Sequence, residues 1–506
     1  MLRFSVFLVA ISFILSGSIP AGNPLNAIEF TGTDKVLPCT DSSLKSLNEV
    51  PSLCSDDEIS PYSARLLSHY ITYASVTGNE NQAGIFISNV ARQKGFHVEI
   101  LTDQPGSFNF TASLYPLDKK KPNVIFLNHI DVVPASSEPG IEYTYPPFSG
   151  TIAEGKIWGR GAIDNKGMAV MQLLGLEYFL DVAAEIDLPF NVTMLSVSGE
   201  ETGGYTGAKI MVDEFLDYLN PVAVYGEGGS GIPGIIRREP DRKLFGISTT
   251  FKRSLWLELT LKNNTSGHGA VPPPDYVVKE KVQALSRLLN ETRRISFCAT
   301  SRNMFRELGK IEGGARGMAL RNLRLFRPFV IRSIKQENIV KSLLTNTITI
   351  TSINSPMAAA NQIPQEIVSV LDCRLLPETT TEDFLEHIHD ILANDLISIR
   401  VIHEKNIIPP TVIDAWYYYM REALQMVYPG AGVIPIIAPA SNDNNYFREH
   451  GIPTYGIMPV FIPVHLLETI HNVDERIPVE ALEQGKAVYR ELIRIIIESK
   501  IDQSAI

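Results

Sequence analysis

The order of strand-length and helix-length stretches constrains the fold of this chain more than any other feature of its sequence. Between residues 61 and 225, stretches with apolar residues at helical spacing alternate with short runs of strand-forming residues. Helices are expected over residues 61–77, 81–94, 166–180 and 206–219, and strands over 97–101, 124–127, 191–197 and 223–225. Alternation at this spacing is typical of an α/β fold, in which helices cover both faces of a sheet.

The order changes after Arg237. Residues 246–261 alternate apolar and polar side chains, as expected of one strand with an exposed face. A helix is then expected over 276–292, strands over 347–353 and 367–375, a helix over 381–394 and a strand over 397–404. Strand, helix, strand, strand, helix, strand is the pattern of a small ferredoxin-like α+β domain. The α/β order returns after Pro409 and Pro410.

These patterns predict a catalytic domain in two segments with a smaller domain inserted into it. A length of 506 residues agrees with this, because one ordinary core seldom extends so far. We place the first catalytic segment at 61–240, the smaller domain at 244–404 with an insertion at 295–346, and the second segment at 405–506. Residues 23–60, rich in Ser, Asp and Pro, are expected to form an irregular N-terminal extension.

Residues 1–22 have the layout of a secretory signal, with Arg3, an apolar run over 4–15 and small residues thereafter. The run is short for a bilayer span, so a cleaved signal is favoured over an uncleaved anchor. No transmembrane segment is expected after its removal. Cys39 and Cys54 lie in one polar segment and could pair in an oxidising compartment. Five Asn-x-Ser/Thr sequons also fit a secreted glycoprotein.

The charge of the chain argues against nucleic acid as a partner, because the net charge is −11 and phosphate binding needs clustered Lys and Arg. The insertion departs from this trend, since several arginines lie there among apolar residues: Arg316, Arg321, Arg324, Arg327 and Arg332. Such a segment is either a basic amphipathic element that contacts a membrane surface or an ordinary solvated helix face. The second interpretation is favoured by the sequence alone.

Histidine and acidic residues follow the predicted strands. His129 and Asp131 come after the strand at 124–127 and point to the same side of an extended chain. That is the arrangement of a metal-binding imidazole and a carboxylate that orients it. The Gly-rich stretch 226–234 lacks the residues of a Walker loop and the Rossmann spacing, and it is interpreted as a backbone turn beside a site.

Four further places offer metal-type ligands at strand ends or loops, where an α/β sheet presents its functional groups. They supply Asp164, the pair Glu200 and Glu201, Glu227, and His471. Each alone would be typical of a solvated turn or a structural histidine. Together, histidine and carboxylate without thiolate suit zinc or another borderline divalent ion. Two histidines and three carboxylates fit two ions that share one carboxylate better than a single ion.

These motifs, in this order from about residue 60 to about 495, resemble the dinuclear zinc hydrolases that include aminoacylase, carboxypeptidase S and glutamate carboxypeptidase. The resemblance implies a zinc-exopeptidase-like catalytic domain, a mixed sheet flanked by helices, with the ferredoxin-like domain as a lid that also serves dimerisation. It implies two zinc ions per chain. His129, Asp164 and Glu227 would hold one ion, and Asp164, Glu201 and His471 the other.

The resemblance also assigns roles around the ions. Glu200 would be the general base, Asp131 would orient the first histidine ligand, and the peptide bond between Asp164 and Asn165 would be cis. The dipeptide Asn442-Asp443 resembles a loop near the second ion, without an assigned role.

In the lid, the resemblance assigns His268 to the tetrahedral oxyanion, often from the partner subunit of a homodimer. Asn361 and Arg374 would grip the substrate carboxylate, with Arg374 as the bidentate group. Two positions depart from the family pattern. Gly269 stands where Ser or Ala is usual, and Gly226 stands where Asp often precedes the ligand Glu.

The resemblance implies a secreted zinc-dependent amidohydrolase of small-molecule substrates. Glutamate at position 227 is similar to the residue at this position in the acylase and carboxypeptidase branch, whereas the aminopeptidase and dipeptidase branch tends to have Asp there. The signal, the insertion and the length are similar to the N-fatty-acyl amino acid hydrolase/synthase branch, which cleaves and reversibly forms an amide. The alternatives are a carboxypeptidase S-like enzyme for small peptides, in a vacuolar or lysosomal lumen, and an inactive binding protein. The last predicts a missing ligand or base, and none is missing.

Overall fold

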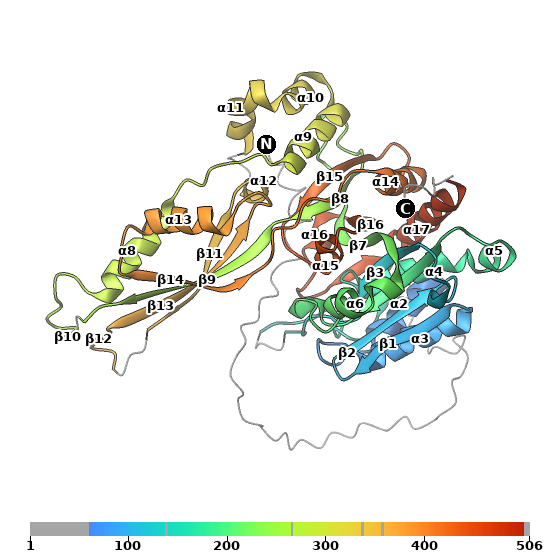
Figure 1. The fold of residues 1–506 in the computed structure, drawn as a ribbon, viewed down its shortest axis with the longest axis horizontal. Coiled ribbons are helices and arrows are strands. Elements are labelled where there is room, and N and C mark those ends of the chain that lie inside the picture. Colours follow the sequence, from blue (N-terminus) through green and yellow to red (C-terminus); the bar gives the residue numbers. More distant parts are fainter. Residues whose placement is uncertain (1–59, 137–139, 265–266, 335–337, 356–358, 500–506) are drawn as a thin grey trace, which may run out of the picture.

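The computed structural model describes residues 60–499 apart from 137–139, 265–266, 335–337 and 356–358 (Figure 1). The predicted signal and almost all of the predicted N-terminal extension, with Cys39 and Cys54, lie outside the described residues. Within the described part of the chain, no helix combines the length and the apolar character that crossing a membrane requires.

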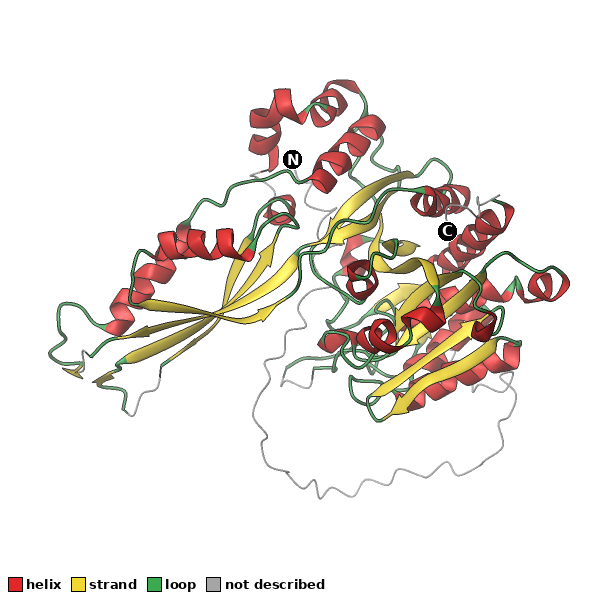
Figure 2. Cartoon of the chain, viewed as in Figure 1, coloured by secondary structure: helices red, strands yellow, loops and turns green. Residues whose placement is uncertain are grey.

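The larger sheet has eight strands in the order β1-β2-β6-β3-β7-β16-β8-β15 (Figures 1 and 2). β3 pairs in parallel with β6 and β7, and β16 with β7, whereas β1 and β2 are antiparallel to their neighbours. The predicted α/β fold with a mixed sheet flanked by helices is confirmed. The bounds are β1 His97–Gln104, β2 Ser107–Ser113, β3 Asn123–His129, β6 Asn191–Val197, β7 Pro221–Ile232, β8 Leu244–Phe251, β15 Gly432–Ala438 and β16 Thr454–Phe461.

The central strand β3 shows why helices cover both faces of this sheet. Val124 and Phe126 join one apolar cluster, and Ile125 and Leu127 join another, because successive side chains of a strand point to opposite faces. The first cluster contains residues of α2 Tyr62–Ile71, α3 Asn81–Lys94, α4 Lys166–Glu177, α14 Ala415–Val427 and α17 Val479–Glu498. The second contains residues of α6 Ala208–Glu214, α7 Leu216–Leu219 and α15 Asn444–Glu449. Short helices α5 Leu180–Glu185 and α16 Val464–Leu467 complete this part.

The smaller sheet has the strand order β11-β13-β9-β14 with antiparallel pairing throughout. Two helices contribute to the single apolar cluster of this sheet, and the order of elements is the one predicted for a ferredoxin-like domain. The elements are β9 Arg253–Lys262, α8 Val277–Asn290, β11 Thr347–Asn354, β13 Glu366–Leu375, α13 Thr381–Leu392 and β14 Ile397–Glu404. At the outer end of this domain lies a two-stranded pair, β10 Gly267–His268 and β12 Gln362–Ile363 (Figure 1).

Some predicted helix bounds differ from the structure, since the helix expected over 61–77 ends at Ile71 and the one expected over 206–219 is divided into α6 and α7. Two further predictions were wrong in ways that bear on the domain boundary and on the site. The single strand expected over residues 246–261 is two strands, β8 in the larger sheet and β9 in the smaller, separated only by Lys252. The alternation of apolar and polar residues does not indicate where the chain passes from one sheet to the other. The burial of the side chains does, because β8 is buried along its whole length and β9 is not. The strand pairing thus favours a domain boundary at Lys252.

The turn expected over residues 226–234 is mostly strand, because β7 continues to Ile232. Its glycines allow close approach to neighbouring strands. A Cβ on Gly228 would lie 2.2 Å from the Gly456 carbonyl carbon, and one on Gly229 would lie 2.4 Å from the Gly246 carbonyl oxygen.

The described residues of the insertion contain the helices α9 Ala299–Glu312, α10 Gly314–Arg321, α11 Leu323–Ile334 and α12 Asn338–Leu343 (Figure 1). α9 packs against β15, and its residues Met304, Phe305 and Leu308 belong to the apolar cluster of the larger sheet. The insertion therefore rests on the catalytic sheet although it interrupts the sequence of the smaller domain.

Candidate metal centre and active site

The five predicted ligands come from five places in the fold that meet at one edge of the larger sheet. His129 ends β3, Glu227 lies in β7, and Glu201 lies in the short 3-10 helix η3 Glu200–Thr202 that follows β6. β3 and β6 are parallel, so their carboxyl ends reach the same edge. Asp164 lies in the turn before α4, and the peptide bond that joins it to Asn165 is cis, as predicted. His471 lies in a turn after α16.

The carboxylate of Asp164 stands between the two histidines. Its Oδ1 lies 3.0 Å from Nε2 of His129, and its Oδ2 lies 3.1 Å from Nε2 of His471. Nε2 of His129 is also 3.5 Å from Oε2 of Glu227, and Nε2 of His471 is 3.1 Å from Oε1 of Glu201. The side chains thus form two groups that share one carboxylate.

The charges of these groups depart strongly from ordinary behaviour. Burial opposes the charged form of His471, but hydrogen bonds to Asp164 and Glu201 raise its pKa to about 11. Burial and, after it, nearby carboxylates raise the pKa of Glu201 to about 7 and that of Glu200 well above its usual range. Acidic groups crowded in a buried site are stabilised by a divalent cation. Together with the nitrogen and oxygen donors, this charge makes the site fit metal ions.

A backbone contact fixes the tautomer of His129. Its Nδ1 lies 3.0 Å from the carbonyl oxygen of Asp131 and 3.5 Å from the carboxylate Oδ1 of the same residue. A carbonyl only accepts hydrogen bonds, so Nδ1 carries a proton, and Nε2 is the ring nitrogen that faces the acidic groups and would bind a metal ion. The orienting role expected of Asp131 is therefore taken in the larger part by its backbone.

The carboxylate of Asp131 has a different set of partners. It accepts backbone N–H bonds from Glu200 at Oδ1 and from Glu201 at Oδ2, both at 3.1 Å, and the hydroxyl of Thr77 donates to Oδ2 at 2.8 Å. Since Asp131 is fully buried, these bonds hold η3 rigidly against the end of β3. The residue thereby positions both the predicted base and one predicted ligand.

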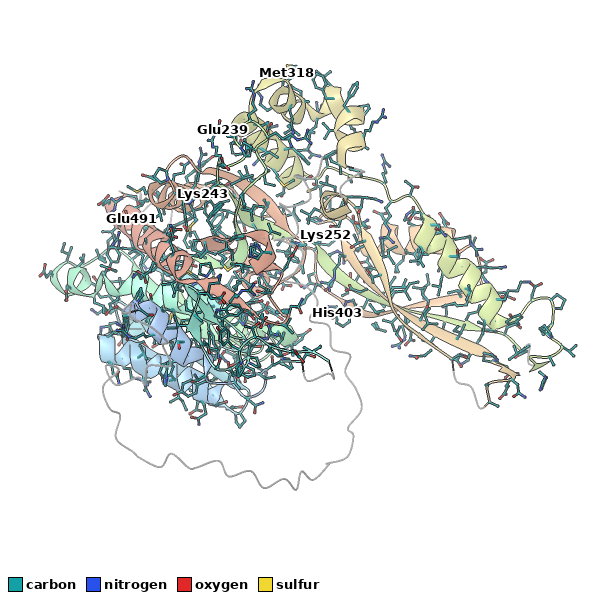
Figure 3. The ribbon with its side chains drawn as sticks, turned by 180° about the vertical axis from the view of Figure 1, so that it is seen from behind. Glu239, Lys243, Lys252, Met318, His403 and Glu491 are labelled. Atoms are coloured by element: carbon teal, nitrogen blue, oxygen red, sulfur yellow. The ribbon has the colours of Figure 1, made fainter. Side chains whose placement is uncertain are left out.

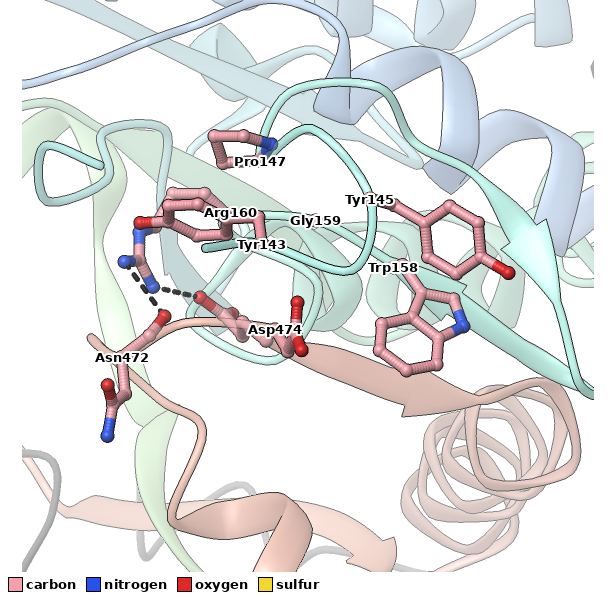
Figure 4. A pocket seen from close by; sticks show the side chains of 9 residues that line it. Tyr143, Tyr145, Pro147, Trp158, Gly159, Arg160, Asn472 and Asp474 are labelled. Carbon is pink, nitrogen blue, oxygen red and sulfur yellow. Dashed lines mark hydrogen bonds and ion pairs between the residues drawn. The ribbon is translucent and has the colours of Figure 1, made fainter. Parts of the chain in front are cut away.

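Glu475 holds the turn that carries Asp164, a role that the sequence reasoning did not assign. Its Oε1 accepts N–H bonds from the backbones of Gly161, Ile163 and Asp164 at 3.1, 2.9 and 3.1 Å. Its Oε2 lies 2.7 Å from Nη1 of Arg160, and both side chains are buried. Figure 4 shows dashed lines from the Arg160 guanidinium to the segment that contains Asn472 and Glu475. Glu475 follows the predicted ligand His471 by four residues, and this proximity in the sequence is the feature that could have indicated its role.

Two other polar groups at this edge were not assigned a role. Asp443 is buried, its Oδ2 has no hydrogen-bond partner among the described residues, and burial raises its pKa to about 8. Nζ of Lys405 lies 3.2 Å from the hydroxyl of Tyr446 and 5.4 Å from the ring centroid of Tyr205. Lys405 forms no ion pair with the described residues, although Asp443 and Glu200 are among the charges that act on it. No local sequence signal marks this lysine.

The three predicted lid residues do not join the metal centre in this chain. His268 lies in β10 at the outer end of the smaller domain, exposed, with its Nε2 at 2.9 Å from Nδ2 of Asn361 (Figure 1). The structure thus brings these two residues together, away from the acidic groups. Arg374 lies on β13 and makes a bidentate pair with Asp372, from Nε to Oδ1 at 2.8 Å and from Nη2 to Oδ2 at 2.9 Å.

Sequence comparison finds relatives along most of the chain. Residues 125–495 match the model of peptidase family M20/M25/M40. The chain is 28% identical over 407 residues to an N-fatty-acyl-amino acid synthase/hydrolase PM20D1 of Bos taurus, covering 78% of each chain. It is 25% identical to a probable carboxypeptidase S-like 2 of Dictyostelium discoideum, covering 75% of this chain and 72% of the relative.

Solved structures share the fold. An M20 family metallo-carboxypeptidase from Sulfolobus solfataricus matches with a TM-score of 0.60 at 19% identity, over 86% of this chain and 99% of that one. A dinuclear metal binding peptidase of the M20 family from Bacillus subtilis matches with a TM-score of 0.52 at 14% identity, over 86% and 98%. The resemblance inferred from the motifs is confirmed, and the chain belongs to peptidase family M20/M25/M40 as a metallohydrolase that acts on amide or peptide bonds.

Proposed function

We propose that this protein is a secreted zinc-dependent amidohydrolase that cleaves N-acyl amino acids, N-fatty-acyl amino acids in particular. The observation that carries the proposal is the placement of Asp164, whose two carboxylate oxygens face one histidine each near the half-buried Glu200. The relatives named as N-fatty-acyl-amino acid synthase/hydrolases support the substrate class.

The residues that would hold zinc follow from the two groups. His129, Asp164 and Glu227 would hold one ion, and Asp164, Glu201 and His471 would hold the other, with Asp164 common to both, as the short distances within each group support. When bound, two zinc ions supply positive charge that lowers the pKa of a water molecule and polarises the amide carbonyl.

Glu200 is the proton carrier of the proposed reaction. It accepts a proton from water as the water oxygen bonds to the carbonyl carbon, and it donates that proton to nitrogen as the carbon–nitrogen bond breaks. The products are a carboxylic acid and an amino acid, and the same steps in reverse form the amide. The N–H bond from Glu200 to Asp131 fixes the start of η3, so the base is held in place before substrate arrives.

Recognition of a free carboxylate requires a cation near this edge. Arg374 was predicted for this task, but two of its donors are engaged by Asp372. Lys405 has no such carboxylate partner among the described residues and lies against Tyr446, whose hydroxyl donates to the carbonyl of Gly203 just after η3. We therefore assign first contact with the substrate carboxylate to Lys405 and keep Arg374 as a second cation.

His268 and Asn361 serve a partner copy in this proposal. Both are exposed and paired with each other at the end of β10 and β12, so they are available to a second chain. A homodimer through the smaller domain would bring the His268 imidazole to the oxyanion that forms in the partner's site. The single-chain arrangement agrees with this division because it leaves the acidic centre without the predicted oxyanion donor.

A substrate series tests the proposal. Acyl chains from acetyl to oleoyl on one apolar amino acid should give kcat/KM values that rise with length, because each buried methylene contributes about 0.8 kcal/mol. The matching C-terminal amides should be poor substrates. Values that peak at acetyl would identify a plain aminoacylase, and faster cleavage of small peptides would favour the carboxypeptidase S-like alternative that one relative suggests. Faster release of the first residue from unblocked, amidated peptides would refute the proposal.

A further inference from the structure

The helical insertion differs in charge from the rest of the chain. Residues 295–346 contain ten Lys and Arg against three Asp and Glu, a net charge of +7, whereas the whole chain carries −11. The other residues therefore carry −18. From Gly313 to Ile334, the length of α10 and α11, there is no acidic residue at all. The positive charge is concentrated on one structural feature, which is where a partner of negative charge would be attracted.

Large apolar side chains are exposed on the same two helices. Leu325 and Phe329 on α11 are 76% and 73% exposed, and Met318 on α10 is 46% exposed. Leu325 and Phe329 are four residues apart, so they lie on one face of the helix. The inner side of α11 is already packed, because Val330 and Ile334 are buried in the main apolar cluster. The outward apolar residues are thus not needed for the core.

Cations without partners flank these apolar residues. Arg321, Arg324 and Arg332 are exposed, and none forms an ion pair or hydrogen bond with a described residue. By contrast, Arg316 pairs with Glu312, and Arg327 lies 5.8 Å from the Phe297 ring centroid. Figure 3 shows Met318 at the top edge of the molecule, on the side of the helical insertion that faces away from the larger sheet.

We propose that α10 and α11 form a docking surface for an anionic phospholipid bilayer. Apolar side chains that enter the acyl boundary, flanked by arginines that meet phosphate oxygens, are the requirements of an interfacial helix. An acidic protein would satisfy the arginines but would leave Leu325 and Phe329 in water. Bilayer docking extends the proposed function to that of an enzyme that acts at a lipid surface. The docking itself does not depend on which substrate the enzyme cleaves.

The test uses the full mature chain and vesicles of phosphatidylcholine, with or without 30% phosphatidylserine, in a co-sedimentation assay at about 0.1 M salt. We expect wild type to sediment with the anionic vesicles and to be released by about 0.5 M salt, because exposed charges are screened. The triple variant Arg321→Gln, Arg324→Gln, Arg332→Gln should lose about 100-fold in partition coefficient, at roughly fivefold for each cation. The pair Leu325→Ser and Phe329→Ser should lose at least tenfold.

A matched pair of substitutions elsewhere serves as the control. Ile353→Ser and Leu396→Ser remove two exposed apolar residues of the smaller domain, at 53% and 57% exposure, and should leave sedimentation unchanged. Near-ultraviolet circular dichroism of each variant checks the fold. The proposal is overturned if wild type does not bind anionic vesicles, if the control pair loses as much as the α11 pair, or if only the arginine variant loses binding. The last result would identify a general polyanion site.

Discussion

Replacing Glu475 by Gln tests whether the turn that carries Asp164 is held by a buried charge. Glu475 is 2% exposed, accepts three backbone N–H bonds at one oxygen and pairs with the buried Arg160 at the other. Glutamine has the same shape and keeps one acceptor oxygen, so the three backbone bonds can persist. What is lost is the negative charge opposite Arg160.

The size of the effect follows from these contacts. Three charge-assisted bonds become neutral ones, at about 1 kcal/mol each, and Arg160 is left with an uncompensated buried charge. Arg160 keeps one neutral acceptor, the carbonyl of Asn472 at 3.1 Å from Nη2. Removing one partner of a buried pair ordinarily costs about 3–5 kcal/mol, and we expect Glu475→Gln to fall in that range. The loosened turn should also weaken metal binding by about 10–100-fold.

The assay separates the two effects. Urea unfolding with excess chelator measures the free energy of unfolding without metal, and competition with a zinc chelator measures affinity in the folded protein. Glu480→Gln is the matched control, since Glu480 is exposed on α17, and it should change stability by less than about 0.5 kcal/mol. The double variant Arg160→Met, Glu475→Met should be less destabilised than Glu475→Gln, because no buried charge remains unpaired. A Glu475→Gln protein as stable as the control would refute the reasoning.

Four further outcomes are expected. Metal analysis should give close to two zinc ions per wild-type chain, none in Asp164→Ala and about one in Glu227→Ala; one ion in fully active wild type would exclude a shared carboxylate. Glu200→Gln should keep its metal and lose about 10²–10⁴-fold in kcat, and a loss of only a few-fold would remove it as the base. His268→Ala should keep its metal and lose about 10²–10³-fold in kcat, and mixing with Glu200→Gln should restore partial activity if the imidazole acts across a dimer. Burial lowers the pKa of Lys252 from 10.5 to about 7, so between pH 7 and pH 10.5 the side chain takes up a proton when the protein unfolds. The free energy of unfolding should therefore rise with pH across that window, and Lys252→Met should reduce the rise.

The parts of the fold that the sequence predicts are those decided by local periodicity. The helix at 81–94 has the predicted bounds, and Gly95 ends it in the left-handed conformation at φ 99°. The buried strand β6 also has the predicted bounds. The division between β8 and β9 was missed because both strands are extended and a single residue separates them. Only the pairing partners, which are remote in sequence, assign them to different sheets.

The candidate site also contains residues whose position the sequence predicts and residues whose position it does not predict. Residues at the ends of parallel strands, such as His129 and Glu201, come together because the sheet itself brings those ends to one edge. Lys405 comes to that edge from the end of β14 in the smaller domain, so its place depends on how the two domains meet. No local pattern contains that information. The same holds for Glu475, whose partners are more than 300 residues away in the sequence.

The separation of His268 from the acidic centre has a consequence for regulation of the reaction. Every group that would hold metal or carry the proton comes from the catalytic segments, and in this chain the predicted oxyanion donor lies beyond their reach at the end of β10. If a second copy supplies that donor, each site depends on contact between two smaller domains, and activity should fall on dilution below the dimer dissociation constant while metal content stays constant. If one chain suffices, the smaller domain must move as a body about the joint at Lys252, where β8 passes directly into β9. Activity would then be independent of protein concentration, so a dilution series distinguishes association from domain closure.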